Sequence, residues 1–237
     1  MSLAIPAPIL TSQPSDSRWH YLYRTAAIAA LVSVAFFLFQ IAAFFLWPPP
    51  STVAGHFALL HSRPFIGLVS LDFLILIDEV LAVPLYLALY LSLRRVHESL
   101  MLIATALSAA SIFCYLIATP ALNMLYLSRQ YAAASTAVDR EELLAAGQAV
   151  LSSWQGTPIQ VGYAVGTIGM LLIACVMLRS EVFGKSAAYV GIVASLVGFG
   201  FYVPKVGVYI SILSVVGMQV WYVMIALVLF RLCRRTN

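Results

Sequence analysis

Charged residues are scarce in this sequence. Asp, Glu, Lys and Arg together make up 9% of its 237 residues, while hydrophobic residues make up 62%. Because soluble proteins contain about 25% charged residues, this composition excludes an ordinary soluble domain, and the mean hydropathy of +0.97 indicates an integral membrane protein. The formal net charge is +4, but the basic residues stand at the ends of apolar runs rather than in one patch. We therefore expect no nucleic-acid partner.

Metal ligands and catalytic motifs are sparse as well. The three cysteines, Cys114, Cys175 and Cys233, are widely separated and show no CxxC spacing, which argues against disulfides and redox chemistry. His56 and His61 are five residues apart, a spacing that does not align them on one helical face, and no third ligand is evident. No GxSxG, HExxH, P-loop or Rossmann pattern occurs in a usable context. We expect no metal, no cofactor and no conventional catalytic site.

Long apolar runs, in contrast, fill most of the chain. A helix needs about 20 mostly apolar residues to cross about 30 Å of hydrocarbon. Six segments predict such spans, and they cover residues 24–47, 65–93, 100–127, 157–178, 186–203 and 206–230. The fifth is short, and only Pro204 and Lys205 separate it from the sixth, so a re-entrant hairpin is the alternative. The predicted fold class is an all-α integral membrane protein with six transmembrane helices.

The distribution of basic residues predicts the orientation of these spans. With the amino terminus inside, the cytoplasmic ends carry Arg18, Arg24, Arg94, Arg95, Arg179, Lys185, Arg231, Arg234 and Arg235, and the outer ends carry Arg63, Arg129, Arg140 and Lys205. The first group outnumbers the second, as the positive-inside rule requires. Both termini are therefore expected in the cytoplasm.

The same reading divides the chain into parts. Residues 1–23 are expected to form a flexible cytoplasmic tail, 24–230 the six-span domain with outer loops at 48–64 and 128–156, and 231–237 a basic cytoplasmic tail. In the second outer loop, Asp139 can cap a helix and Glu142 follows at capping-box spacing. Apolar residues then recur at helical spacing up to Trp154. We expect an outer amphipathic helix that lies on the membrane interface, with Trp154 at headgroup depth.

An acidic run interrupts the second apolar segment. Asp72, Asp78 and Glu79 lie in LDFLILIDEVLAVPLY, where a carboxylate in lipid costs several kcal/mol (about 3) unless it meets a partner or water. Asp72, Glu79 and Tyr86 are spaced by heptads and would share one helical face, while Asp78 points about 100° away. Asp78 and Glu79 are expected near the bilayer midplane, and Asp72 about a third of the way in from the outer side. Pro84 removes the bond to a preceding carbonyl and predicts a bend. Intramembrane acids of this kind predict a site for a ligand or a proton.

Other spans offer polar partners for these acids. Tyr115 in the third span and Gln219 in the sixth lie at compatible depth, and we expect them to line a cavity between spans two, three and six with Tyr86. The alternative is that the carboxyl groups are neutral and merely hydrogen-bond across helices. Lys205 could reach inward and form a gate pair with Asp72, or it could extend outward to water.

Glycines and other small residues have a structural explanation. In spans four and five, several of them stand at small-xxx-small spacing, which lets helices approach closely. The residues are Gly162, Gly166, Gly191, Ala194, Ser195 and Gly198. They predict helix packing rather than chemistry.

Three stretches resemble a known family. VPLYLALYLSLRRVHESLMLIATALSAASIFCYLI, LYLSRQYAAASTAVDREELLAAGQAVLSSWQGT and VMLRSEVFGKSAAYVGIVASLVGFGFYVP are similar to the bacterial multi-spanning membrane family called domain of unknown function 4386. The resemblance extends from about span two to the end of the chain, and AAGQAVL in the polar outer segment is its most specific part. It implies six spans, an acidic residue early in span two that corresponds to Asp72, and a bacterial inner-membrane location. The family has no established activity to carry over.

These observations favour binding or transport of a small apolar or weakly charged molecule by the buried carboxyl groups of span two. One alternative is a non-catalytic interaction or assembly protein, which binds a second copy or another membrane protein through small-residue faces and the outer helix. A further alternative is an intramembrane enzyme that modifies lipids, with the acids as general acid and base. The lipid bilayer is a partner in all three cases.

Overall fold

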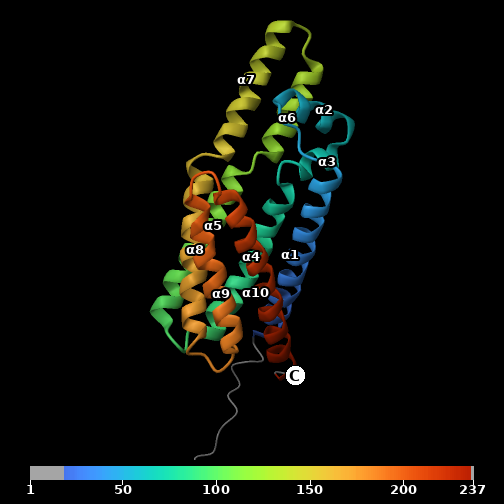
Figure 1. Cartoon of the computed structure of the whole chain (residues 1–237). Coiled ribbons are helices and arrows are strands. Elements are labelled where there is room, and N and C mark those ends of the chain that lie inside the picture. Colours follow the sequence, from blue (N-terminus) through green and yellow to red (C-terminus); the bar gives the residue numbers. More distant parts are fainter. Residues whose placement is uncertain (1–18, 236–237) are drawn as a thin grey trace, which may run out of the picture.

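The computed structural model describes residues 19–235, and within that range the chain is helical with no strand (Figure 1). Six helical segments are long and apolar enough to cross a membrane, which confirms the predicted all-α fold class. Their helices are α1 His20–Leu46, α4 Phe73–Leu93, α5 Glu98–Ala118, α8 Thr157–Met177, α9 Lys185–Gly198 with the 3-10 turn η2 Phe199–Tyr202, and α10 Gly207–Arg235. The protein is a multi-pass membrane protein.

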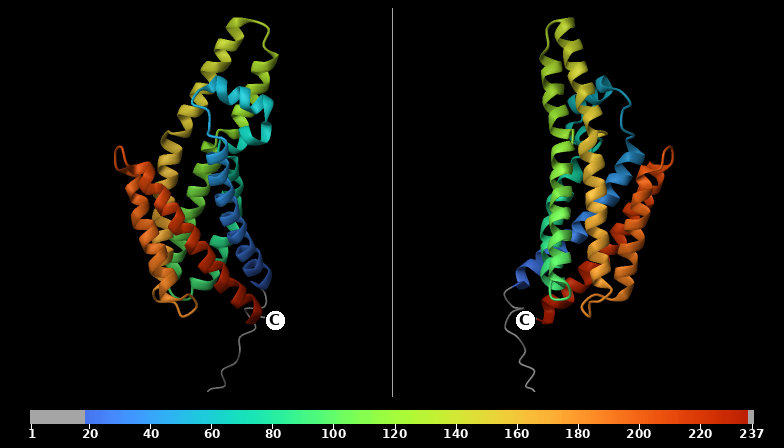
Figure 2. Two further views of the ribbon diagram at one scale, coloured as in Figure 1. Left: turned by 45° about the vertical axis from the view of Figure 1, so that its right-hand side comes forward. Right: turned by 90° about the vertical axis from the view of Figure 1, so that its left-hand side faces the viewer.

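These helices form a closed ring. Helix α1 packs against α4 and α10, α5 packs against α4 and α8, and α9 packs against α8 and α10. The first and last helices therefore meet, and His20 Nδ1 lies 3.2 Å from the Cys233 carbonyl oxygen. Both described ends of the chain lie at one end of the ring (Figure 2), as an even number of spans requires. We call this the terminal end.

A group of shorter helices covers the opposite end. It consists of α2 Val53–Ser62, α3 Pro64–Val69, α6 Ala121–Ala133 and α7 Ala137–Trp154, and we call it the cap. Helices α6 and α7 project from the bundle as a hairpin, roughly in line with α5 and α8 (Figures 1 and 2). The predicted outer helix is thus present as α7, but it points along the bundle, in line with α8, rather than across its end.

Packing within the cap explains why α7 stands upright. Gly147 is the buried residue of α7, and a Cβ atom there would lie 2.5 Å from Val53 Cγ1 and 2.9 Å from Phe57 Cζ. Only glycine allows α2 to approach α7 this closely. The amino terminus of α7 is capped by Thr136, which accepts a hydrogen bond from the Asp139 amide at 3.1 Å. Asp139 is thus the third helical residue and not the cap.

Several predicted boundaries also change. The second predicted span divides into α3 and α4, with Asp72 between them in the left-handed conformation at φ 60°. The third ends at Ala118, before Pro120, and residues 121–127 belong to α6. Helices α1 and α10 include residues 20–23 and 231–235, which were expected in the tails. The remainder of the predicted tails, residues 1–18 and 236–237, lies outside the described residues.

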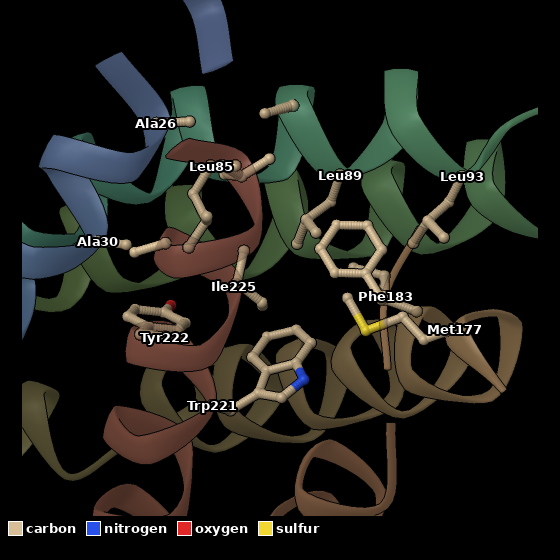
Figure 3. Packing of buried hydrophobic residues seen from close by; sticks show 14 of the residues in the cluster. Ala26, Ala30, Leu85, Leu89, Leu93, Met177, Phe183, Trp221, Tyr222 and Ile225 are labelled. Atoms are coloured by element: carbon tan, nitrogen blue, oxygen red, sulfur yellow. The ribbon is translucent and has the colours of Figure 1, made fainter. Parts of the chain in front are cut away.

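An apolar core fills the half of the ring next to the terminal end. Leu89 and Leu93 of α4 face Phe183 and Met177 in Figure 3, and Trp221 of α10 is fully buried in the same cluster. Close helix approach at glycines makes this possible, because a Cβ at Gly191 would lie 2.7 Å from Trp221 Nε1. The composition of this half is explained by the packing of apolar side chains alone.

Glycines on α8 and α9 are used for contacts within the chain. A Cβ atom at Gly162 would lie 2.8 Å from Cys114 Cβ of α5, and one at Gly169 would lie 2.9 Å from Ser108 Oγ. Gly198 similarly faces Ser214 of α10 at 3.0 Å. The predicted packing role is confirmed for Gly162, Gly191 and Gly198, and Gly169, which was not among the predicted residues, packs in the same way. Large apolar side chains point outward instead, including Phe113, Ile117 and Leu213 with exposed fractions of 65%, 75% and 64%, which suits contact with lipid.

Candidate functional site

A polar cavity of about 120 Å³ lies within the ring, in the half next to the cap. Side chains from α4, α5, α8, α9 and α10 line it, and α1 closes the ring behind α4. We call it the central cavity. It differs from the predicted cavity, which was expected between spans two, three and six, because all spans after the first contribute to its wall.

The acidic groups of the central cavity are Asp78 and Glu79. Both lie in the second turn of α4 rather than near its middle, because the helix begins at Phe73. Ser33 of α1 presents its hydroxyl to Asp78, yet Asp78 Oδ1 is buried with no hydrogen-bond partner among the described residues. An unsatisfied buried carboxyl oxygen is costly, so this position calls for a water molecule, a proton or a ligand.

Tyr86 lies on the same face of α4 as Glu79, one heptad closer to the apolar half of the ring. Both residues line the cavity as predicted. The hydroxyl groups of Tyr222 on α10 and Ser108 on α5 lie beside that of Tyr86. Ser108 Oγ donates its own proton to the Ala104 carbonyl at 2.9 Å, so its lone pairs remain free to accept. Pro84 lies inside α4, and the helix continues through it.

Hydroxyl groups from α5, α8 and α10 complete the lining. Tyr115, which the sequence predicted, joins Tyr163 and Ser214 at the cavity wall. Ser214 Oγ donates to the Ala194 carbonyl at 2.8 Å, and Ser111 Oγ donates to the Gly162 carbonyl at 2.8 Å. Both oxygens can still accept a hydrogen bond from a ligand or water.

Sequence reasoning missed several lining residues. Ser108 and Ser111 precede the predicted Tyr115 on α5, at i, i+3 and i+7, and this spacing could have revealed a polar face. Tyr222 carried no comparable signal, because it is a single tyrosine in an apolar stretch.

Two predicted members do not line the central cavity. Gln219 is buried at 7% exposure, and its Oε1 has no hydrogen-bond partner among the described residues, but it is absent from the cavity wall. Asp72 lies in the turn before α4, so it is not part of the helical face that Glu79 and Tyr86 share. Lys205 is exposed in a turn before α10 with φ 70°. Burial is the cause of the raised pKa of Asp72, and no charged neighbour contributes to it. The structure therefore does not show the predicted pair of Asp72 and Lys205.

Asp72 instead lines a second cavity of about 370 Å³ beneath the cap. We call it the cap cavity. His56 of α2 and Gln148, Ser152 and Gln155 at the end of α7 and just after it also contribute to its wall. Burial raises the pKa of the Asp72 carboxyl to about 7, and it lowers the pKa of the His56 imidazole below its ordinary value. Both groups are thereby biased toward their neutral forms.

The two cavities differ in what they can hold. Sites for small organic molecules usually measure about 300–1,000 Å³, so the cap cavity is large enough and the central cavity is smaller than this range. The central cavity fits a few water molecules, a proton or a very small molecule. Within the described residues, no cluster of three or more His, Cys, Asp or Glu side chains could hold a metal ion.

Comparison with known proteins provides no relative. No family model matches this chain, and neither a curated protein nor a solved structure matches it. Function must therefore be argued from the two cavities and their residues alone.

Proposed function

We propose that the protein binds or transports a small apolar or weakly charged molecule, and that Asp78 and Glu79 in the central cavity take up protons or contact the polar part of that molecule. The observation that carries this proposal is the adjacent acid pair with an unsatisfied oxygen in a cavity surrounded by apolar helices. Ionisable groups inside membrane bundles most often mark ion, proton or substrate pathways.

The asymmetry of the bundle supports this proposal. The central cavity lies on the cap side, while the apolar core around Trp221 and Leu89 closes the side next to the terminal end. A ligand in the cavity would therefore exchange with the cap side in this conformation. Passage to the other side requires the helices of the apolar core to separate, which is the change that alternating access demands.

Cavity size limits the ligand. At about 120 Å³, the central cavity is too small for a drug-sized molecule, so we propose that protons and water occupy it in this state. Adjacent carboxyl groups rarely ionise together, and a pair of this kind can bind and release one proton. A larger ligand would require α4 to move relative to α5 and α8.

The assembly alternative loses one of its two supports. The small residues expected to bind partner spans are used between α5 and α8 and between α9 and α10 of the same chain. The projecting α6 and α7 hairpin remains as a surface for a partner. For the enzyme alternative, Asp78 and Glu79 could serve as general acid and base, but no additional observation favours it.

Membership of the domain of unknown function 4386 family and a bacterial inner-membrane location remain part of this proposal. They rest on the resemblance of the three stretches described above. The cytoplasmic position of both termini rests on the distribution of basic residues.

Expression in a bacterial host with a panel of membrane-permeant weak acids and amines tests the proposal. We expect the wild-type protein to change growth inhibition by at least one compound, and Asp78→Asn combined with Glu79→Gln to abolish that change at equal protein level in the membrane. Glu141→Gln, which replaces an exposed carboxyl of α7, is the matched control. If the double variant acts like wild type, the acid pair is not the site.

A further inference from the structure

The cap cavity has a wall rich in hydrogen-bond acceptors. Asp72 supplies a carboxyl group, and Ser70 and Ser152 supply hydroxyl oxygens whose protons are already donated to the carbonyls of Gly67 and Gln148, each at 2.8 Å. Only the lone pairs of these two oxygens remain available to a ligand. The lining contains no Lys or Arg, so its only side chain that can carry a full negative charge, Asp72, has no basic residue beside it in the wall.

His56 adds a buried group that lacks a partner. Its side chain is 6% exposed and lines the cavity, and Nδ1 has no hydrogen-bond partner among the described residues. The imidazole donates to the Pro50 carbonyl, which in the neutral ring leaves Nδ1 as an acceptor. A buried acceptor without a donor destabilises the folded protein. This nitrogen is a second, independent sign that the cavity receives a hydrogen-bond donor.

The backbone at Asp72 fits such a role. Asp72 adopts φ 60° between α3 and α4, a conformation that is uncommon for residues other than glycine. Such backbone conformations persist at functional sites where surrounding structure maintains them. Here the left-handed turn presents the carboxyl group to the cavity instead of to the helix face.

Apolar side chains also contribute to the wall. Trp154, Leu71, Leu151 and Pro120 line the cavity, which argues against a bare metal ion. An indole ring also attracts organic cations through its π face. The volume of about 370 Å³ lies within the range for small organic ligands.

We propose that the cap cavity binds a small organic cation, a primary amine with an apolar body, whose ammonium group contacts Asp72 and His56 Nδ1. The cavity and its residues carry this proposal, which does not depend on the function proposed for the central cavity. The ammonium group supplies donors to the Asp72 carboxyl and to His56 Nδ1, and the apolar body contacts Trp154 and the neighbouring leucines.

Binding of tyramine to the purified protein in mild detergent tests this proposal by calorimetry at pH 8. Two matched probes share the aromatic body: 4-ethylphenol lacks the charge, and 4-hydroxyphenylacetate reverses it. A charge-assisted hydrogen bond contributes about 1.5–3 kcal/mol, so we expect tyramine to bind at least about tenfold more tightly than either analogue. Equal affinities, or no measurable tyramine binding, would overturn the proposal.

Asp72→Asn is the decisive variant. Asparagine tolerates the left-handed conformation as well as aspartate does, so the turn is expected to form. We expect this variant to weaken tyramine binding at least about tenfold, while Asp139→Asn, on the exposed part of α7, leaves the affinity unchanged. Unchanged binding in Asp72→Asn would refute the site. If Asp72→Asn does not fold, Ser152→Phe fills the cavity from an exposed helical position and must also abolish binding.

Variants of the central cavity separate this proposal from the previous one. Glu79→Gln is expected to leave tyramine affinity unchanged. If Glu79→Gln abolishes binding and Asp72→Asn does not, the amine binds in the central cavity. That result would overturn the cap site while supporting the function proposed for the acid pair.

Discussion

The two halves of the helix ring use the same helices in opposite ways. Helix α4 contributes Asp78 and Glu79 to a polar cavity in its first half and Leu89 and Leu93 to an apolar core in its second. Helix α10 likewise turns Ser214 toward the cavity and buries Trp221 in the core. The apolar core and the central cavity are thus separated along the helix axes rather than between helices.

The contrast between the two halves indicates where the protein tolerates imperfect packing. The half next to the terminal end is filled by large side chains, with the indole Nε1 of Trp221 as a buried donor without a partner, whereas the half next to the cap retains a cavity and an unsatisfied carboxyl oxygen. Binding sites commonly persist at some expense of stability. Substitutions should therefore destabilise the apolar half and be neutral or stabilising at the polar half.

The largest effect is expected for Trp221→Ala, which breaks the apolar half. Trp221 is fully buried beside Gly191, so its removal should cost about 3–5 kcal/mol of unfolding free energy. Trp47→Ala removes the same side chain from a position that is 40% exposed and should cost far less. Thermal unfolding in detergent measures both. Similar losses in the two variants would show that the apolar half is not the stabilising part.

A pH-dependent effect is expected for Asp72→Asn in the cap cavity. Because burial raises the pKa of Asp72 from 3.8 to about 7, the folded state binds a proton more strongly than the unfolded state. The wild type should therefore lose stability as pH rises from about 4 to about 7 and then level off. The Asn variant lacks this loss. Its free energy of unfolding should therefore rise relative to that of the wild type over this pH range, by up to about 4 kcal/mol.

Thermal unfolding of both proteins at several pH values provides the measurement. His56 is the other titratable group in the lining, and its lowered pKa acts in the opposite direction, since it favours folding as pH rises toward 6.5. His56 is common to both proteins, so the difference between them isolates Asp72. A pH-independent difference would contradict the assignment.

Gly147→Leu should disrupt the cap without affecting the ring. The added side chain would collide with Val53 and Phe57, and overpacking of this kind costs about 1–3 kcal/mol. We expect faster proteolysis of the cap and loss of any ligand bound in the cap cavity. Ala145→Leu, on an exposed position of α7, is the control and should resist proteolysis as wild type does.

The smallest effect is expected for Glu79→Gln in the central cavity. A neutral amide is less costly to bury than a carboxylate in this environment. At pH 8 we therefore expect the free energy of unfolding of the variant to exceed that of the wild type by about 1–2 kcal/mol. Glu141→Gln on the exposed α7 should change stability by less than about 0.5 kcal/mol. A lower melting temperature for Glu79→Gln alone would identify the carboxyl as a structural partner between helices.

Local periodicity predicted part of the site correctly. Glu79 and Tyr86 share one face of α4, and both line the central cavity with Asp78 and Tyr115. Asp72 was placed on the same face because the apolar run was read as one helix. The left-handed turn at Asp72 ends that helix early. Aspartate tolerates such a turn, but Asp78 in the same run is helical, so residue type alone does not locate the turn. The functional roles of these residues stay predictions.

Gln219 shows a further limit of local patterns. Its depth along the sixth span predicted a place in the cavity wall, but depth does not determine the direction in which a side chain points around a helix, and Gln219 is buried away from that wall. Lys205 is exposed in its turn, which is the outward one of the two alternatives for this residue. Rotation of each helix is set by its neighbours, which pack through residues far away in the sequence.

The sequence by itself determined that this is an all-α protein with six membrane-spanning segments, because apolar length and scarcity of charge act locally along the chain. It also identified the acids of α4 as exceptional, since their cost in lipid depends on residue type. Only the tertiary structure decided which polar groups meet in each cavity, that Asp72 belongs to the cap, and that α7 stands upright. These features depend on close contacts between distant segments, such as Gly147 against Val53, which no local pattern encodes.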